Sequence, residues 1–185
     1  MTRLKQTTSR VSEIINLMDT DELNILGVEL LIEELQEYLV AEFDESYRTV
    51  LDDDFDDALL LASVYAVVGG ETFADRIERY VAESTSADTL KQAIETLAIT
   101  DGHRVREEAK IAAGTDAERL GYTVTKTWRS VKIPTTRDTH FGLDGVTIPI
   151  NEYFETANGK ALYPGGFGNA EEDVNCLCWL DVKIS

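Results

Sequence analysis

Hydrophobic residues recur at helical spacing along the first two-thirds of the chain. Residues 21–43 carry one apolar face opposite a face of acidic and amide side chains, which predicts an amphipathic helix. That apolar face consists of Leu31, Leu35, Tyr38 and Leu39. Candidates to cap this helix are Asp19, Thr20 and Asp21. Residues 71–83 predict a further helix with its own apolar stripe, and residues 55–68, apolar nearly all round, predict the central helix of the core.

The last helix of this region is predicted to be long, covering about residues 87–120. Ser86 can cap its start, and Leu90, Ile94 and Leu97 form its early apolar stripe. Gly102 interrupts the pattern, and a glycine inside a helix costs about 1 kcal/mol relative to alanine. We therefore expect either a kink at Gly102 or a close approach of another element.

After Gly121 the pattern changes to strict alternation. Residues 122–129 alternate apolar and polar positions and are rich in Thr, Val, Tyr and Trp, which predicts a β-strand. Short strands are also expected at 146–150 and 175–184, with turn-rich stretches between them. The sequence thus predicts an α+β protein, with a helical N-terminal two-thirds (residues 1–120) and a small β-rich C-terminal module (residues 121–185).

The chain is strongly acidic. It has 35 Asp and Glu against 17 Lys and Arg, a formal net charge of −18 and a pI near 4.4. Such a charge repels phosphates, so we expect no sequence-specific nucleic acid partner. Two interpretations stay open: ordinary acidic solubility, or a host with high internal salt. The acidic runs at 52–57 and 171–173 are interspersed with apolar residues and are expected to be solvated surface.

The apolar runs are too short to span a bilayer. The longest, residues 58–68, falls well below the roughly 18–20 residues that a membrane helix needs, so no membrane partner is expected. The first ten residues lack the apolar core of a secretory signal. We therefore expect the protein to be made in a host cytoplasm.

All histidines and cysteines lie in the second half of the chain: His103, His140, Cys176 and Cys178. Two of each is a possible tetrahedral zinc set. In a strand, Cys176 and Cys178 would point to one face with Cα atoms about 6.6 Å apart. That is the upper edge for a disulfide, so two thiolates converging on one metal is easier. The alternative is that the cysteines are small buried apolar side chains and that His103 is a hydrogen-bonding histidine.

Several ordered motifs resemble one family. The runs 126–154 and 160–180 contain a Lys-Trp strand, Thr-Arg-Asp-x-His-x-x-Leu-Asp-Gly, a Pro-Gly turn and Asn-Cys-x-Cys. The matching residues are Lys126, Trp128, Thr136, Arg137, Asp138, His140, Leu143, Asp144, Gly145, Pro164, Gly165, Asn175, Cys176 and Cys178. A preceding helix motif matches through Thr100, Asp101, His103 and Arg104. This pattern, over about residues 98–182, resembles the phage Mu F-like head morphogenesis family of tailed viruses. The chain departs from it at Leu177, where the family usually has arginine, and at Asp101, where it has glutamate.

The resemblance implies a set of structural signature residues: Trp128, Arg137, Asp138, Asp144, Gly145 and Asn175. The resemblance also implies a possible metal site, since some members carry a second cysteine pair. In this chain Arg137 and His140 stand at the positions of that pair. A closed structural zinc site would then use His140, Cys176 and Cys178, with His103 or Asp138 as the fourth ligand. The competing interpretation is a hydrogen-bonded core in which Arg137 pairs with Asp138 or Asp144, and Asn175 caps a turn.

The function implied by the resemblance is that of a non-enzymatic minor head protein. It would lie in the virion, in the head interior or at the portal vertex, with portal or capsid proteins as partners. The alternative is a metal-dependent hydrolase or nuclease using Asp138, His140, Asp144, His103 and Glu107. The basic residues available to bind a nucleic acid substrate would be few, limited to Arg129, Lys132 and Arg137. A third possibility is a packaging adaptor for a toxin, but the sequence stops at Ser185, so we expect no effector domain.

Overall fold

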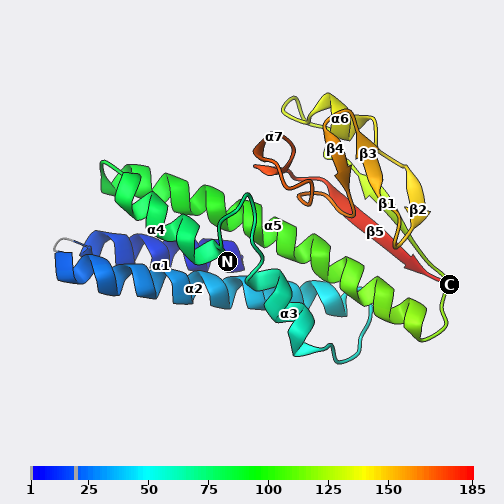
Figure 1. Cartoon of the computed structure of the whole chain (residues 1–185), viewed down its shortest axis with the longest axis horizontal. Helices are drawn as coiled ribbons and strands as arrows, with labels where there is room; N and C mark the ends of the chain where they lie inside the picture. Colours follow the sequence, from blue (N-terminus) through cyan, green and yellow to red (C-terminus); the bar gives the residue numbers. More distant parts are fainter. Residues whose placement is uncertain (1, 19–20) are drawn as a thin grey trace.

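The computed structural model of this protein describes residues 2–18 and 21–185 (Figure 1). The helices are α1 (Arg3–Leu17), α2 (Asp21–Arg48), α3 (Asp57–Val64), α4 (Phe73–Glu83), α5 (Ala87–Arg119), α6 (Asp138–Phe141) and α7 (Ala170–Asp173). The strands are β1 (Val124–Arg129), β2 (Thr147–Pro149), β3 (Phe154–Thr156), β4 (Gly159–Ala161) and β5 (Trp179–Ile184). The predicted α+β class is therefore confirmed. Two capping candidates, Asp19 and Thr20, lie outside the described residues.

The helical part is built on three long helices, α1, α2 and α5, which pack along one another (Figure 1). Their apolar stripes meet in one core, because residues three and four apart in a helix share a face. Its fully buried members include Leu31, Leu35, Leu39, Phe43, Ile77 and Ile94. The amphipathic helices predicted at 21–43 and 71–83 are confirmed as α2 and α4.

The helix predicted over residues 55–68 is present but shorter, and the prediction that it is the central helix of the core is wrong. Helix α3 has only eight residues, and it lies against α2 and α5 with Leu61 and Tyr65 more than half exposed. The chain turns early because Val68 and Glu71 exchange backbone hydrogen bonds around Gly69 and Gly70, both at positive φ. The longer α2 and α5 take the centre instead.

Helix α5 begins and behaves as the sequence indicates. Ser86 caps it through a capping box with Thr89. At Gly102 another element does approach closely: a Cβ atom there would lie 2.5 Å from the hydroxyl of Tyr38 on α2. Glycine is thus required for the close packing of α2 on α5.

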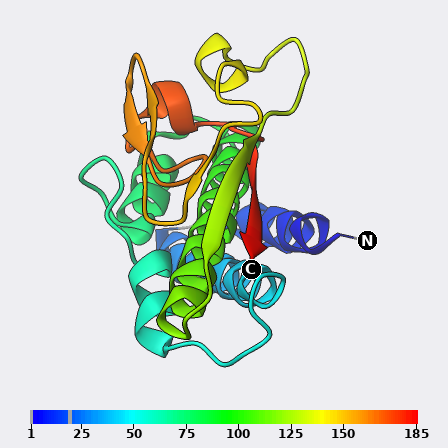
Figure 2. The ribbon, with the colours of Figure 1, turned by 90° about the vertical axis from the view of Figure 1, so that its right-hand side faces the viewer.

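The C-terminal module lies along α5 (Figure 2). Its antiparallel sheet has the order β2-β1-β5, with Trp128 opposite Leu180, and a β3–β4 hairpin stands beside it. A second apolar core forms here from Trp128, Leu143, Phe154, Cys176, Cys178 and Leu180. The strand expected at 175–184 starts only at Trp179. The division at residue 120 stays a prediction, because α5 packs on both halves.

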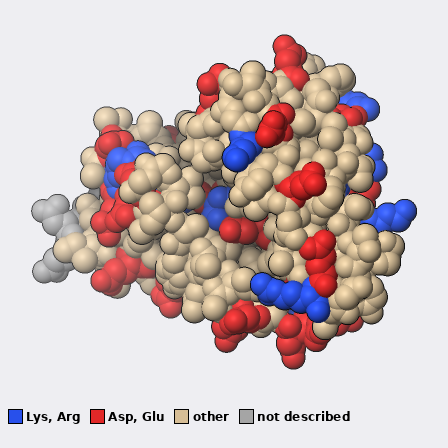
Figure 3. All heavy atoms as spheres, turned by 45° about the vertical axis from the view of Figure 1, so that its right-hand side comes forward, with Lys and Arg blue, Asp and Glu red and all other residues tan. Residues whose placement is uncertain are grey.

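Acidic side chains are spread over the visible surface (Figure 3). The prediction of a solvated acidic run is confirmed for the aspartates of 52–57, which are all exposed. It is wrong for Glu172 and Asp173, which are buried because α7 turns them inward. Asp173 accepts three backbone N–H groups, from Phe167, Gly168 and Asn169. Among the described helices, none is both long and apolar enough to cross a membrane.

Candidate metal centre

Three soft donor atoms converge inside the C-terminal module. The imidazole of His140, on α6, points its Nδ1 atom at Cys176 and Cys178, which lie in the extended segment before β5. The Nδ1 atom is 3.6 Å from each sulfur. All three side chains are buried, and their donor atoms lie within 4.8 Å of one another.

A tight turn brings the cysteines to His140. Asn175 adopts a left-handed φ of 53°, and the Cys176 N–H donates to the carbonyl of Asp173. The Asn175 N–H donates to Thr100 Oγ1 on α5, which ties this turn to the long helix. On the other side, Ser130 Oγ donates to the His140 carbonyl at 2.6 Å and holds α6 in place.

A buried carboxylate lies on the far side of the imidazole. Glu172 Oε2 is 2.7 Å from His140 Nε2, although the two groups are not aligned for a straight hydrogen bond. Glu172 is fully buried and also accepts from Asn158 and Thr139. Sequence reasoning missed Glu172. The available signal was Asn169 three residues earlier, whose side chain caps α7 at the Glu172 N–H.

The candidate fourth ligands lie elsewhere. Within the described part of the chain, the group of close donor atoms contains His140, Cys176 and Cys178, and neither His103 nor Asp138. His103, on α5, packs on the turn at Gly165, and burial lowers its pKa to about 3. Asp138 starts α6 and is exposed.

The two thiols differ in acidity because they interact with each other. The pKa of Cys178 is lowered, mainly because the Cys176 thiol hydrogen-bonds to it. The pKa of Cys176 is raised by the same hydrogen bond and by burial. The hydrogen bond between the thiols thus shifts their two pKa values in opposite directions.

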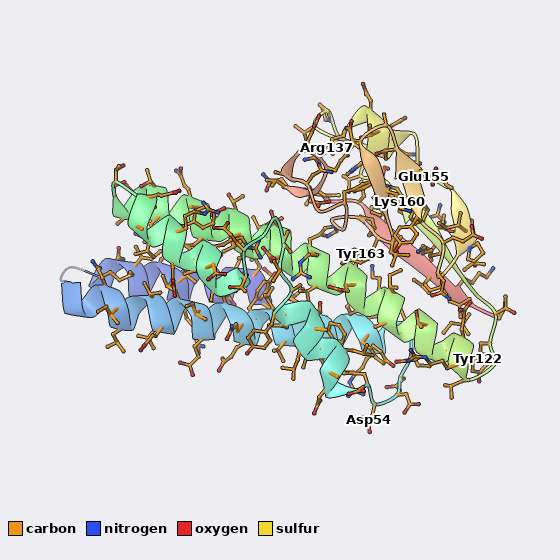
Figure 4. The ribbon with its side chains drawn as sticks, in the orientation of Figure 1. Asp54, Tyr122, Arg137, Glu155, Lys160 and Tyr163 are labelled. Carbon is orange, nitrogen blue, oxygen red and sulfur yellow. The ribbon has the colours of Figure 1, made fainter. Side chains whose placement is uncertain are left out.

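The expected pairing of Arg137 with Asp138 or Asp144 is wrong. Arg137 instead donates to the carbonyls of Glu171 and Val174, and Figure 4 shows it beside α7. These carbonyls belong to the end of a short helix, where acceptors are otherwise unpaired. Asp144 accepts the Ser130 N–H at 3.0 Å, which lowers the pKa of that carboxyl, and its other oxygen pairs with Lys132.

Trp128 and Gly145 build the frame around the imidazole. Trp128 is fully buried, with its ring 5.2 Å from that of His140 and 5.1 Å from that of Phe154. Gly145, at φ 82°, donates its N–H to the Trp128 carbonyl, so the turn before β2 is fixed to β1. Both residues therefore have architectural contacts.

Two residues of the family motif on α5, Asp101 and Arg104, hold neighbouring helices in place. Asp101 forms two 2.8 Å hydrogen bonds with Arg76 of α4. Arg104 bonds Glu108 and the carbonyl of Ser63, which holds α3 against α5. The motif thus joins three helices.

The carboxylates proposed for a hydrolase are not assembled at one place. Glu107 binds Lys110 and the backbone of Leu180, while Asp144 binds Ser130 and Lys132. Neither lies in the group of donor atoms around His140 within the described residues.

Comparison with known proteins places these residues in a family. The chain matches the family model described as "Phage Mu protein F like protein" over residues 58–181. The chain belongs to this family. The resemblance seen from about residue 98 is thereby confirmed, and it extends back to α3. Membership of the phage Mu F-like family supports a role in phage head morphogenesis.

A curated relative is a much longer protein. The protein named NAD(+)--arginine ADP-ribosyltransferase EFV, from Enterococcus faecalis (strain ATCC 700802 / V583), is 35% identical over 109 residues. That stretch is 59% of this chain and 22% of the relative, so the match spans about a fifth of that protein's length. No solved structure matches the chain.

Proposed function

We propose that this phage Mu F-like protein is a minor head protein of a tailed virus, located in the head interior or at the portal vertex, and that it acts by binding and not by catalysis. The observation that carries the proposal is the family match over residues 58–181. Its partners would be the portal protein, the capsid proteins, or both.

The use of the signature residues supports an architectural role. The guanidinium of Arg137 and the backbone groups of Trp128 and Gly145 form hydrogen bonds with backbone atoms of the module itself. Asn175 and Leu180 are bound by side chains of α5, so the module is fixed to the helical part. A rigid body of this kind suits an assembly component, which must present the same surface in every copy.

The surroundings of the His140 cluster support a non-enzymatic role. The cavity beside it measures about 20 Å³, which admits one water and no substrate. The acidic surface also disfavours a nuclease, because phosphates would be repelled.

Co-purification with the portal protein of the same virus tests this proposal. We expect the full chain to form a stable complex with the portal protein or the major capsid protein, detectable by size-exclusion chromatography. The salt concentration is varied, since an acidic surface responds to screening. Failure to bind either protein at every salt concentration contradicts the proposal.

The name of the longer relative motivates a direct activity control. The purified chain is incubated with NAD⁺ and an arginine-containing acceptor, and ADP-ribosylation is followed by mass spectrometry. We expect no transfer above that of heat-denatured protein. Transfer that depends on the folded chain would overturn the non-enzymatic part of the proposal and leave family membership intact.

A further inference from the structure

We propose that His140 Nδ1, Cys176 Sγ and Cys178 Sγ bind one structural zinc ion, with Glu172 as the residue that positions the imidazole. The fourth coordination position would be taken by a water molecule. This differs from a closed site of four protein ligands, and it assigns a role to Glu172.

The distances fit tetrahedral zinc. Bond lengths of about 2.0 Å to nitrogen and about 2.3 Å to sulfur place those two ligand atoms about 3.5 Å apart on a tetrahedron. The observed separation is 3.6 Å from His140 Nδ1 to Cys176 Sγ and 3.6 Å to Cys178 Sγ. Both nitrogen–sulfur pairs therefore have the spacing that an ion between them requires, and the two sulfur atoms lie within 4.8 Å of each other.

A hydrogen bond to the imidazole accounts for only one of the two thiols. Neutral imidazole has one nitrogen lone pair that can accept a proton. Two sulfurs lie at equal distance from that single acceptor, so only one thiol can use it. A metal ion bound by two thiolates and Nδ1 uses all three donor atoms, and binding releases the thiol protons.

Glu172 fits the role of a positioning carboxylate. An imidazole that ligates through Nδ1 carries its proton on Nε2, and metal-bound histidines usually turn that proton toward a carboxylate or carbonyl. Glu172 Oε2 is 2.7 Å from Nε2, out of line with the N–H bond, and its side chain is itself held by Asn158 and Thr139. The carboxylate lies behind the imidazole and away from the sulfurs, so it orients His140 and does not ligate.

The space for the fourth ligand is small. The cavity beside the cluster has about 20 Å³ and is lined by, among others, Val131, Thr136, Arg137 and Asn175. One water molecule needs roughly 10–15 Å³ by this measure. A single water therefore completes the coordination, and with no room for a substrate the ion is structural.

The ion would join three short segments that have little structure of their own. Helices α6 and α7 have four residues each, and the cysteine segment precedes β5 without regular hydrogen bonding. Small modules of this kind are commonly held together by metals or disulfides. Both cysteines are free thiols here, which leaves them available to a metal.

Metal analysis of the full-length protein tests the site. Protein purified under reducing conditions with zinc is expected to retain one zinc per chain, and removal by a chelator should lower its melting temperature reversibly. Cobalt(II) added to the stripped protein should give sulfur-to-cobalt charge transfer and the strong visible bands of tetrahedral coordination. Absence of uptake by the reduced wild-type chain, or an octahedral cobalt spectrum, overturns the proposal.

Variants separate ligands from their neighbours. Cys176→Ser and Cys178→Ser should each lose the cobalt–thiolate absorption in proportion to the sulfur removed. Leu177→Ser is the matched control, since Leu177 lies between the cysteines with its side chain about half exposed, and it should bind zinc like the wild type. Equal zinc binding by the wild type and both cysteine variants contradicts the assignment.

The role of Glu172 has its own readout. Glu172→Gln keeps the size of the side chain but removes the charge next to Nε2 and one of the two oxygens that accept hydrogen bonds. We expect about 10–100-fold weaker zinc affinity at unchanged stoichiometry. A merely structural role would lower the stability of the metal-free protein and leave the zinc affinity as it is, which would refute positioning by Glu172.

Discussion

Leu180 donates its backbone N–H to the carboxylate of Glu107 at 2.7 Å, across 73 residues of sequence. Lys110, one turn further along α5, donates to the carbonyl of the same Leu180 and to Glu107. Strand β5 is an edge strand whose other side pairs with β1. At Leu180, two side chains of α5 thus take the place of a neighbouring strand and pair backbone groups that would otherwise be open at this edge.

Removing this cover should loosen the module. Glu107→Ala leaves the Leu180 N–H and the Lys110 ammonium without their acceptor in a buried position, so we expect a loss of about 2–4 kcal/mol in the free energy of unfolding. Urea denaturation measures it. Glu95→Ala, at an exposed position of the same helix, is the control and should cost less than about 0.5 kcal/mol. Equal losses in the two variants would contradict the role given to Glu107.

The contact at Gly102 predicts an unusual response to alanine. Gly→Ala inside a helix normally stabilises it by up to about 1 kcal/mol. Here the new methyl group would lie 2.5 Å from the Tyr38 hydroxyl, so we expect Gly102→Ala to destabilise by about 1–3 kcal/mol. Thermal unfolding of Gly102→Ala, Tyr38→Ala and the double variant should show that the two changes are not additive.

Gly142 supplies the comparison for that experiment. It has helical backbone angles, and a Cβ atom there would meet only carbonyl oxygens at 3.6 Å. Gly142→Ala should therefore be neutral or slightly stabilising. If both glycine variants behave alike, close packing of Tyr38 on α5 is not the reason for Gly102.

Lys126 should make stability depend on pH in the alkaline range. Its ammonium is buried and donates to the carbonyls of Ile150 and Leu162, and burial lowers its pKa from 10.5 to about 8. Between these values the unfolded chain binds the proton more strongly, so the free energy of unfolding rises with pH. We expect a gain of about 1–2 kcal/mol between pH 8 and 10 after allowing for solvent screening.

Lys126→Met tests the origin of that slope. This variant cannot titrate, and it leaves two buried carbonyls without a donor, so it should be less stable at pH 8 than the wild type. The difference in stability between the wild type and Lys126→Met should widen as the pH rises to 10. Above pH 10 the raised pKa values of Tyr47 and Tyr163 oppose the effect, which limits the useful range. A constant difference across this range would remove Lys126 as the cause.

The acidic surface predicts that the chain does not bind free DNA. With a net charge of −18, few counterions are released when it meets a duplex. Fluorescence anisotropy with labelled duplex DNA at 0.15 M salt should give no binding up to about 100 µM protein, the weak end of the usual range of non-specific dissociation constants. A basic protein of similar size serves as the positive control. Saturable binding by this chain would contradict the prediction that its negative charge prevents DNA binding.

Local patterns in the sequence predicted the long elements well. Helices α2, α4 and α5 follow from apolar spacing, and β1 from alternation, because each buries one regular face. The early end of helix α3 could not be predicted, since an all-round apolar pattern does not reveal that residues 65–71 fold back into a tight turn. The start of β5 was also misplaced, because the left-handed conformation of Asn175 interrupts the extended pattern.

The candidate metal centre could be predicted only in part from the sequence. The scarcity of histidine and cysteine pointed to His140, Cys176 and Cys178, which the fold does bring together. The sequence could not exclude His103 as a ligand, because the distance between His103 and the other three residues depends on how the module packs on α5. Glu172 was hidden in an acidic run that resembles solvated surface, and only the inward turn of α7 shows its burial.

Helix α5 has 33 residues and therefore runs about 50 Å, and it provides a wall for the helical core and for the β-rich module alike. If either half unfolds, one side of α5 loses its packing partners and becomes exposed to solvent. Heat or denaturant should consequently melt the protein in a single cooperative step, and a fragment cut at residue 120 would expose the strip on which the missing sheet rests.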